Sequence, residues 1–228
     1  MECRGIGFMI QTIFANKHMI FEIINISDRC IVMKMPVKKN RGKNSCNANL
    51  WIVNLYAPTE CATDEDKQAF YDMIEDKVWN RIPKHDYTIC LGDMNAMTGK
   101  RKDDLDEAEI LGNFDMNVRN DNDNGDRLIH MCRRQKLRIV NTCFRKPRGQ
   151  ATWKFQGKCN ESTNVWRRLD YIMVDNSEMR KVQDCVKWFH LENYLYFRKI
   201  SEKRTSDKSR TKVVDRSNIG EKKKDKEF

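Results

Sequence analysis

The sequence lacks any long hydrophobic run, and no segment approaches the roughly 20 apolar residues that a membrane-spanning helix requires. It also lacks the Cys-x-x-Cys spacing of many structural zinc sites, although it contains 9 cysteines. Its first residues show no basic stretch followed by an apolar segment and a small-residue cleavage site, so we expect no secretory signal. These absences predict free thiols in a reducing, intracellular compartment, nuclear or cytoplasmic, and no membrane partner.

Internal repeats are also absent, and 228 residues predict one sizeable domain followed by a tail. We place the domain at residues 1–190 and a basic, polar, disordered tail at residues 191–228. The formal net charge is +10, and residues 198–228 contribute 12 Lys and Arg against 6 Asp and Glu. A basic tail of this kind favours polyanions as partners, although it is more commonly a solvated end.

Short runs rich in Ile, Val, Phe and Trp predict strands, and polar segments between them predict turns and loops. The predicted strands are residues 5–10, 20–26, 29–35, 50–56, 87–91, 137–142, 151–155, 169–174 and 182–189. The expected connections are a turn at residues 25–28, a basic hairpin loop at 38–49 and a long Asp- and Asn-rich loop at 97–124.

Two helices interrupt these strands. The first follows Thr63, carries acidic residues in its first turn and repeats apolar residues at helical spacing as far as Ile82. The second is expected at residues 125–136, with Asn124 as its cap. The alternation of strand blocks with helices predicts an α/β or α+β sandwich.

The segment Gly92-Asp93-Met94-Asn95-Ala96 follows an apolar strand. Side chains alternate along a strand, so Asp93 and Asn95 are expected to point the same way at its end. A carboxylate beside a carboxamide suits the activation and orientation of a water molecule. An Asx turn that closes the strand is the alternative, because Asp, Asn and Gly are the usual turn residues.

Two further motifs fall at predicted strand ends. One is Asn54-Leu55-Tyr56-Ala57-Pro58, and the other is Trp166-Arg167-Arg168-Leu169-Asp170-Tyr171-Ile172, preceded by Ala151-Thr152-Trp153. Taken alone, a tyrosine before a proline is more often a packing residue, and an Arg-x-Asp strand is more often a surface ion pair.

In this order, the three motifs resemble the endonuclease/exonuclease/phosphatase family, closest to the endonuclease domains of non-LTR retrotransposons and to craniofacial development protein 2-like proteins. The resemblance covers residues 5–187. It implies a DNase I-like two-sheet α/β sandwich, incomplete at both ends, and a metal-dependent DNA endonuclease. Other matching segments are Gly5-Ile6-Gly7-Phe8, Ser27-Asp28-Arg29, Leu111-Gly112, Asn124-Gly125 and Ile139-Val140-Asn141-Thr142.

The resemblance implies a role for each matching residue. Asp93 would orient or deprotonate the attacking water, Asn95 would bind water or phosphate, and Tyr56 would donate its phenol to a phosphate oxygen. Thr152 would hydrogen-bond near the scissile phosphate, and Asp170 would orient a catalytic histidine. The family also implies one divalent metal, usually Mg²⁺, and DNA as the partner.

The last motif contains three more candidate residues. Trp166, Arg167 and Arg168 would contact the nucleic-acid backbone, although a structural role for them is equally open.

The sequence also departs from the family pattern. The glutamate of a Gln-Glu motif, which is the family's main metal ligand, would lie upstream of Gly5, and Glu2 is too close to serve. No Ser-Asp-His segment occurs: His190 does not follow an Asp, and Ser206-Asp207 precedes a lysine. No metal ligand is therefore assigned, and we expect a truncated or divergent domain with weak or no nuclease activity.

Three functions follow as hypotheses. The first is a metal-dependent DNA phosphodiesterase, which rests on the ordered motifs. The second is a non-catalytic remnant that binds nucleic acid through Lys and Arg, which rests on the departures and the charge. The third is a protein-interaction module, for which the sequence names no partner.

Overall fold

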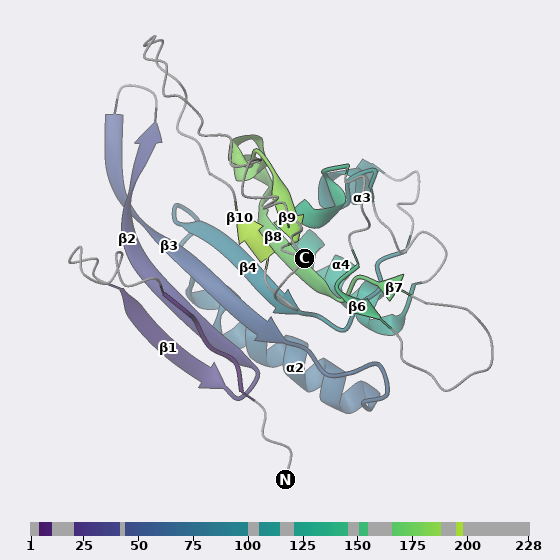
Figure 1. Cartoon of the computed structure of the whole chain (residues 1–228). Coiled ribbons are helices and arrows are strands. Elements are labelled where there is room, and N and C mark those ends of the chain that lie inside the picture. Colours follow the sequence, from purple (N-terminus) through teal and green to yellow (C-terminus); the bar gives the residue numbers. More distant parts are fainter. Residues whose placement is uncertain are drawn as a thin grey trace, which may run out of the picture.

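The structure is a computed structural model that describes residues 5–10, 21–41, 44–99, 105–114, 121–145, 151–154, 166–187 and 195–197. These residues form a mixed α/β structure, so the predicted fold class is confirmed (Figure 1). No helix in these ranges is long and apolar enough to cross a membrane.

A six-stranded sheet forms the centre, in the order β1-β2-β3-β4-β8-β5. β3 and β4 are parallel and are connected through helix α2 (Asp64–Lys77), whereas the other neighbouring strands are antiparallel. Two parallel strands end at the same side of a sheet, so the last residues of β3 and β4 lie together. The strands are β1 (Glu22–Ser27), β2 (Cys30–Arg41), β3 (Asn44–Tyr56), β4 (Tyr87–Asp93), β8 (Asp170–Asp175) and β5 (Leu137–Ile139).

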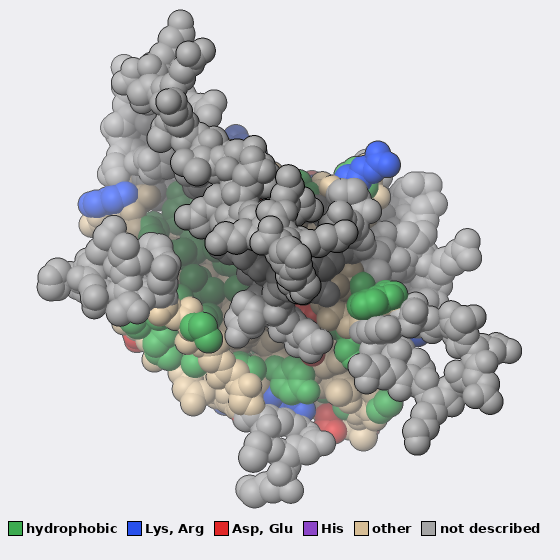
Figure 2. Space-filling view, viewed as in Figure 1, with side chains coloured by type: hydrophobic (Ala, Val, Ile, Leu, Met, Phe, Trp, Pro, Cys, Tyr) green, Lys and Arg blue, Asp and Glu red, His purple; other side chains and the backbone are tan. Residues whose placement is uncertain are grey.

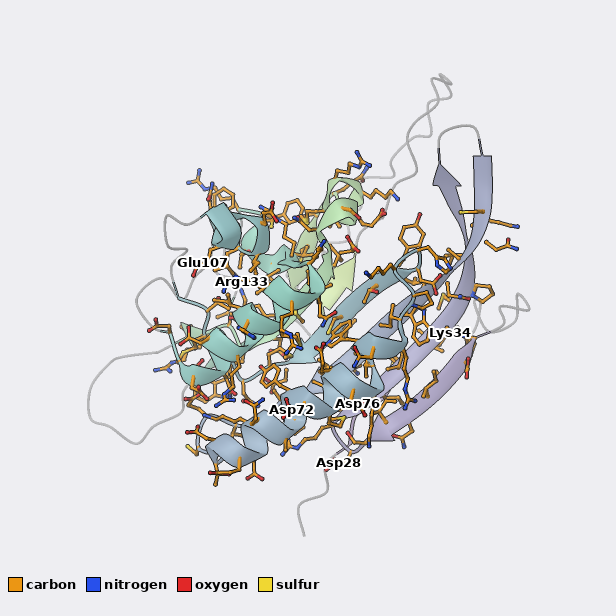
Figure 3. All side chains as sticks on the ribbon, turned by 180° about the vertical axis from the view of Figure 1, so that it is seen from behind. Asp28, Lys34, Asp72, Asp76, Glu107 and Arg133 are labelled. Atoms are coloured by element: carbon orange, nitrogen blue, oxygen red, sulfur yellow. The ribbon has the colours of Figure 1, made fainter. Side chains whose placement is uncertain are left out.

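Two helices, α2 and α4 (Asp123–Gln135), cover one face of this sheet (Figures 1 and 3). The predicted cap of α2 is confirmed, because the hydroxyl of Thr63 accepts a hydrogen bond from the Asp66 N–H at 3.1 Å. The predicted cap of α4 is wrong by two residues. Asn122 is the cap, with its Oδ1 accepting from the Gly125 N–H at 2.9 Å, and Asn124 is instead buried within the first turn.

The main core lies between this face and the two helices. Alternate residues of β3 and β4 point into it, and α2 and α4 contribute one apolar side each. The three fully buried cysteines of the core fill positions that suit small apolar side chains. The core includes Cys30, Val53, Leu55, Ile74, Cys90, Leu128, Cys132 and Met173.

The opposite face of the sheet is also apolar. The strand registers place one residue from each of five strands in a single row, namely Ile23, Met33, Ile52, Ile89 and Val174. Figure 2 shows hydrophobic side chains gathered on this face, over β2 and β3. A smaller core covers its β4 and β8 part, built on Ile172, Val140, Val182 and Cys185.

Residues 5–10 lie over this second face and do not form the predicted strand. The side chain of Asn54 donates to the Gly7 carbonyl at 3.0 Å, and β3 is already paired on both sides. A segment that lies above a central strand cannot extend its hydrogen-bond ladder, which explains why the strand is absent here.

Several other boundaries differ from the prediction. The expected loop at residues 38–49 is mostly strand, because β2 and β3 stay paired from Cys30–Leu55 to Arg41–Asn44. The long loop at 97–124 contains a short helix, α3 (Leu105–Ile110), and the predicted strand at 137–142 ends as a 3₁₀ turn, η2 (Val140–Thr142). Cross-strand pairing and packing, which local composition does not encode, decide these segments.

Four short strands form two small sheets beside the main one. β6 (Trp153–Lys154) pairs with β7 (Trp166–Arg167), and β9 (Cys185–Lys187) pairs with β10 (Leu195–Phe197). β10 falls within the stretch predicted to be a tail. Most of that stretch, including Ser206, lies outside the described residues, as does His190 at the end of the predicted domain.

Candidate active site

Three of the predicted site residues form one row at the end of the main sheet. Tyr56 of β3 is the register partner of Asp93 of β4, and Asp93 is the partner of Asp170 of β8. Directly opposed residues on neighbouring strands share a face and have Cβ atoms about 5 Å apart. The structure therefore brings together residues that are more than 110 positions apart in the sequence.

Gly92 allows β3 and β4 to approach closely just before this row. Its φ angle is +143°, and a Cβ atom at this position would lie 1.9 Å from the Leu55 carbonyl oxygen. Beyond it, the Asp93 carbonyl accepts from the Ala57 N–H at 2.9 Å, and the Met94 N–H donates to the Leu169 carbonyl at 2.9 Å. The backbone of the motif is thereby fixed to both neighbouring strands.

The carboxyl of Asp93 has a raised pKa. Burial, and secondly the carboxylate of Asp170, raise the pKa of Asp93 to about 6, against an opposing hydrogen bond from the Asn95 N–H. That hydrogen bond reaches Oδ1 at 2.9 Å, and Oδ2 accepts none from the described residues. A carboxylate with a pKa near 6 is ionised at neutral pH and is a stronger base than an ordinary aspartate.

Asn95 does not share a strand face with Asp93, because β4 ends at Asp93. Its backbone has a left-handed conformation with φ +46°, and its N–H bond to Asp93 closes an Asx turn. The Asx turn, which was the alternative interpretation of this motif, is therefore formed. The carboxamide Nδ2 donates to the Ala57 carbonyl at 2.9 Å, which places Asn95 beside the segment that follows Tyr56.

Thr152 lies over the start of β8. Its hydroxyl oxygen accepts from the N–H groups of Leu169 and Asp170, at 2.9 and 3.2 Å. The Thr152 N–H donates to the Arg167 carbonyl at 2.9 Å. Because a hydroxyl can accept two bonds and still donate one, Thr152 can still donate one beside Asp170.

Tyr56 is held by Arg29 of the β1–β2 turn. The Arg29 Nη1 donates to the Tyr56 carbonyl at 3.2 Å, and its guanidinium carbon lies 5.1 Å from the centre of the tyrosine ring. The Tyr56 N–H donates in return to the Arg29 carbonyl at 2.9 Å. Arg29 was part of a matching motif, but the sequence gave no sign that it contacts Tyr56.

The predicted nucleic-acid contacts Trp166 and Arg168 differ in exposure. Trp166 is 50% exposed, and Trp153 on the paired strand β6 is 41% exposed. Arg168 is 0% exposed, and the Arg167 Nη1 donates to the Met97 sulfur at 3.0 Å. As placed, Trp166 can reach a ligand at the surface, whereas the buried position of Arg168 favours the structural alternative.

The described residues show no complete set of protein ligands for a metal ion. Among the residues that the structure describes, no three side chains of His, Cys, Asp or Glu come together as metal ligands. Mg²⁺ is commonly bound by one or two carboxylates together with substrate phosphates, so the protein side chains alone need not form such a set. We derive no step through a metal from these residues.

The fold and the site together define an α/β protein with a partly buried acid pair and a tyrosine at one end of its sheet. No protein-family model matches the chain. It is 33% identical over 147 residues to craniofacial development protein 2 of Bos taurus and 32% identical to that of Tragulus javanicus. The matches confirm the resemblance to craniofacial development protein 2-like proteins that the motifs indicated.

These matches are partial in both directions. They cover 60% of this chain and 23% of each relative, so the chain spans about a quarter of the relatives' length. Among solved structures, an AP endonuclease from Archaeoglobus fulgidus matches with a TM-score of 0.44 and 12% identity, covering 69% of this chain and 56% of that one.

Proposed function

We propose that the chain carries the water- and phosphate-handling residues of a DNase I-like, metal-dependent DNA endonuclease of retrotransposon origin. The observation that carries this proposal is the row of Tyr56, Asp93 and Asp170, in which Asp93 has a pKa of about 6. The order of the motifs and the similarity to craniofacial development protein 2 support it.

Each residue of the row has a distinct task in this proposal. Asp93 accepts a proton from the attacking water through Oδ2, and burial together with the carboxylate of Asp170 opposite keeps Asp93 basic. Tyr56, held by Arg29, donates its phenol to a phosphate oxygen. Thr152, beside Asp170, and Asn95, beside Ala57, orient the phosphate or the water.

We also propose that this chain has only weak nuclease activity on its own. The printed sequence contains neither the Gln-Glu glutamate nor the Ser-Asp-His histidine of the family pattern. The loss of one positioned acid or base typically lowers a rate by about 10²–10⁴-fold. Mg²⁺ dependence is part of the proposal by family resemblance only.

Plasmid nicking in the presence and absence of Mg²⁺ tests this function. We expect slow, Mg²⁺-dependent nicking by the unmodified chain and at least about tenfold less by Asp93→Ala, because the base is removed. Asp76→Ala is the matched control, since Asp76 is exposed on the outer side of α2 (Figure 3). Equal nicking by Asp93→Ala and the control would contradict the proposal.

Nucleic-acid binding without catalysis is the second candidate function. The net charge of +10 and the exposed indole of Trp166 favour it, since basic groups attract phosphates and aromatic rings stack on bases. DNA binding by a chain that nicks no plasmid would support this candidate over the first.

A further inference from the structure

We propose that Asn124 is a positioning residue for the Asp93 site: its buried side-chain amide joins the segment after β3 to the segment after β4 and holds Asn95 in place. The catalytic consequence rests on the proposed function, but the coupling from Asn124 to Asp93 exists without it.

The side-chain amide of Asn124 donates two hydrogen bonds inside the protein. The residue is 0% exposed, and its Nδ2 donates to the Pro58 carbonyl at 3.0 Å and to the Asn95 carbonyl at 3.2 Å. A primary amide has two N–H bonds, so both are used. Pro58 lies two residues after Tyr56, and Asn95 lies two residues after Asp93. The Asn124 side chain therefore connects the ends of β3 and β4.

The start of α4 is fixed against the same segment by two other contacts. The side chain of Asn122 donates from Nδ2 to the Asn95 carbonyl at 3.2 Å and accepts at Oδ1 from the Met97 N–H at 2.8 Å. At Gly125, a Cβ atom would lie 2.0 Å from the Met97 carbonyl oxygen. The start of α4, which carries Asn124, is therefore packed closely against the segment that follows β4.

Asn95 needs this support because of its backbone conformation. Its φ angle of +46° is uncommon for a residue other than glycine, and such conformations persist when surrounding contacts determine them. The same residue supplies the N–H that bonds Asp93 Oδ1 at 2.9 Å and the amide that bonds the Ala57 carbonyl. Loss of the Asn124 contact would therefore loosen the hydrogen bond that Asp93 receives.

Ion pairs from Lys67 to two partly exposed carboxylates hold the other side of the connection. The Asn124 N–H points to Glu60 Oε2 at 3.4 Å, and the nearly buried Lys67 lies 3.4 Å from Glu60 and 3.1 Å from Asp123. This group ties the segment after β3 to both α2 and α4. A change at Asn124 is thus expected to act on the site while the helices stay in place.

The test is the titration of the Asp93 carboxyl by ¹³C NMR on the full chain without DNA. The variants are Asn124→Ala and, in case that variant does not fold, Asn124→Ser. Because a hydrogen bond to the ionised carboxylate lowers its pKa, we expect the Asp93 midpoint to rise by about 0.5 pH unit or more in either variant. A folded variant whose Asp93 midpoint stays at the unmodified value overturns the proposal.

Two controls separate positioning from general destabilisation. Ile129→Val trims the core side of the same helix, and Asn80→Ala removes an exposed asparagine. Both are expected to leave the Asp93 midpoint unchanged. An equal shift in Ile129→Val would mean that any loosening of α4 moves the titration, and it would overturn the specific role of Asn124. If the unmodified chain nicks no plasmid but the Asn124 variants still raise the Asp93 midpoint, the proposed function is contradicted and the positioning role of Asn124 stands.

Discussion

At the scale of single residues, the ionised carboxylate of Asp93 lowers the stability of the fold. It is partly buried and faces Asp170 across two antiparallel strands. A buried carboxylate beside another carboxylate is destabilised when both are ionised. Groups of this kind occur at functional sites more often than in purely structural positions.

The stability of the chain should therefore depend on pH through Asp93. The pKa of Asp93 rises from an unfolded value of 3.8 to about 6, so its contribution to stability is full below pH ~4 and is lost as pH rises through ~6. Asp93→Asn should stabilise the chain at pH 8 by about 1–3 kcal/mol and have little effect at pH 4. Urea unfolding at the two pH values measures this.

Asp76→Asn, at an exposed position, is expected to change stability by less than about 0.5 kcal/mol at either pH. A loss of stability in Asp93→Asn at pH 8 would show that the carboxylate is favourably placed, contrary to this account.

Sequence motifs identified Tyr56, Asp93 and Asp170 because short segments at strand ends carry them. The registers of β3, β4 and β8 then place all three in one row. The sequence could not show that Asn95 leaves the strand direction or that Arg168 is fully buried. Both depend on contacts between segments that are distant in the chain.

At the scale of elements, the buried carboxylate of Asp86 joins the start of β4 to β3. It accepts from the Asn49 N–H at 2.8 Å, the Asn49 Nδ2 at 3.1 Å and the Trp51 Nε1 at 2.8 Å. Burial alone would raise the pKa of Asp86, but the hydrogen bonds from Trp51 and Asn49 hold it below its usual value. This carboxylate fixes the register of the two parallel strands that position Tyr56 and Asp93.

Removal of the Asp86 carboxylate should destabilise the fold. Asp86→Ala leaves the indole N–H of Trp51 and the backbone N–H of Asn49 without their acceptor, at a cost of about 2–4 kcal/mol. The pKa of Asp86 is lowered in the folded chain, so its contribution is present above pH ~4 and is lost as pH falls below that. Chemical unfolding of the variant at pH 7 and pH 3 checks both statements.

Asp86→Asn keeps one acceptor oxygen and should lose less stability than Asp86→Ala. Equal stability of Asp86→Ala and the unmodified chain at pH 7 would show that the carboxylate does not hold β3 to β4.

Local sequence patterns predicted the long elements well. Helix α2 begins after Thr63 as expected, and Phe70, Ile74 and Val78 are buried. The failures lie where pairing decides the outcome. Residues 5–10 are apolar but lie over an already paired strand, and residues 38–49 are polar but continue the ladder between β2 and β3.

At the scale of the whole molecule, charge is concentrated in one part of the sequence. Residues 198–228 hold 12 of the 43 Lys and Arg residues and contribute a net charge of +6 to the total of +10. The assignment of residues 191–228 as a tail remains a prediction. If DNA is a partner, this segment should supply much of the salt-dependent attraction.

Deletion of residues 198–228 should weaken binding to a duplex oligonucleotide at 50 mM salt by about tenfold or more and make the binding less sensitive to salt. The melting temperature should change by no more than a few degrees, because the described core lies before residue 198. Fluorescence anisotropy and thermal unfolding measure the two quantities. Unchanged affinity in the shortened chain would exclude this segment as the source of attraction.

The central claim is that Asp93 and Asp170 form a partly buried acid pair, and the ¹³C NMR titration of Asp93 tests it most directly. We expect a midpoint of about 6 in the unmodified chain and a lower midpoint in Asp170→Asn, because the second carboxylate helps to raise it. Burial alone should still keep that midpoint above the ordinary value of about 3.9. A midpoint near 3.9 in the unmodified chain, or one that Asp170→Asn leaves unchanged, would contradict the account.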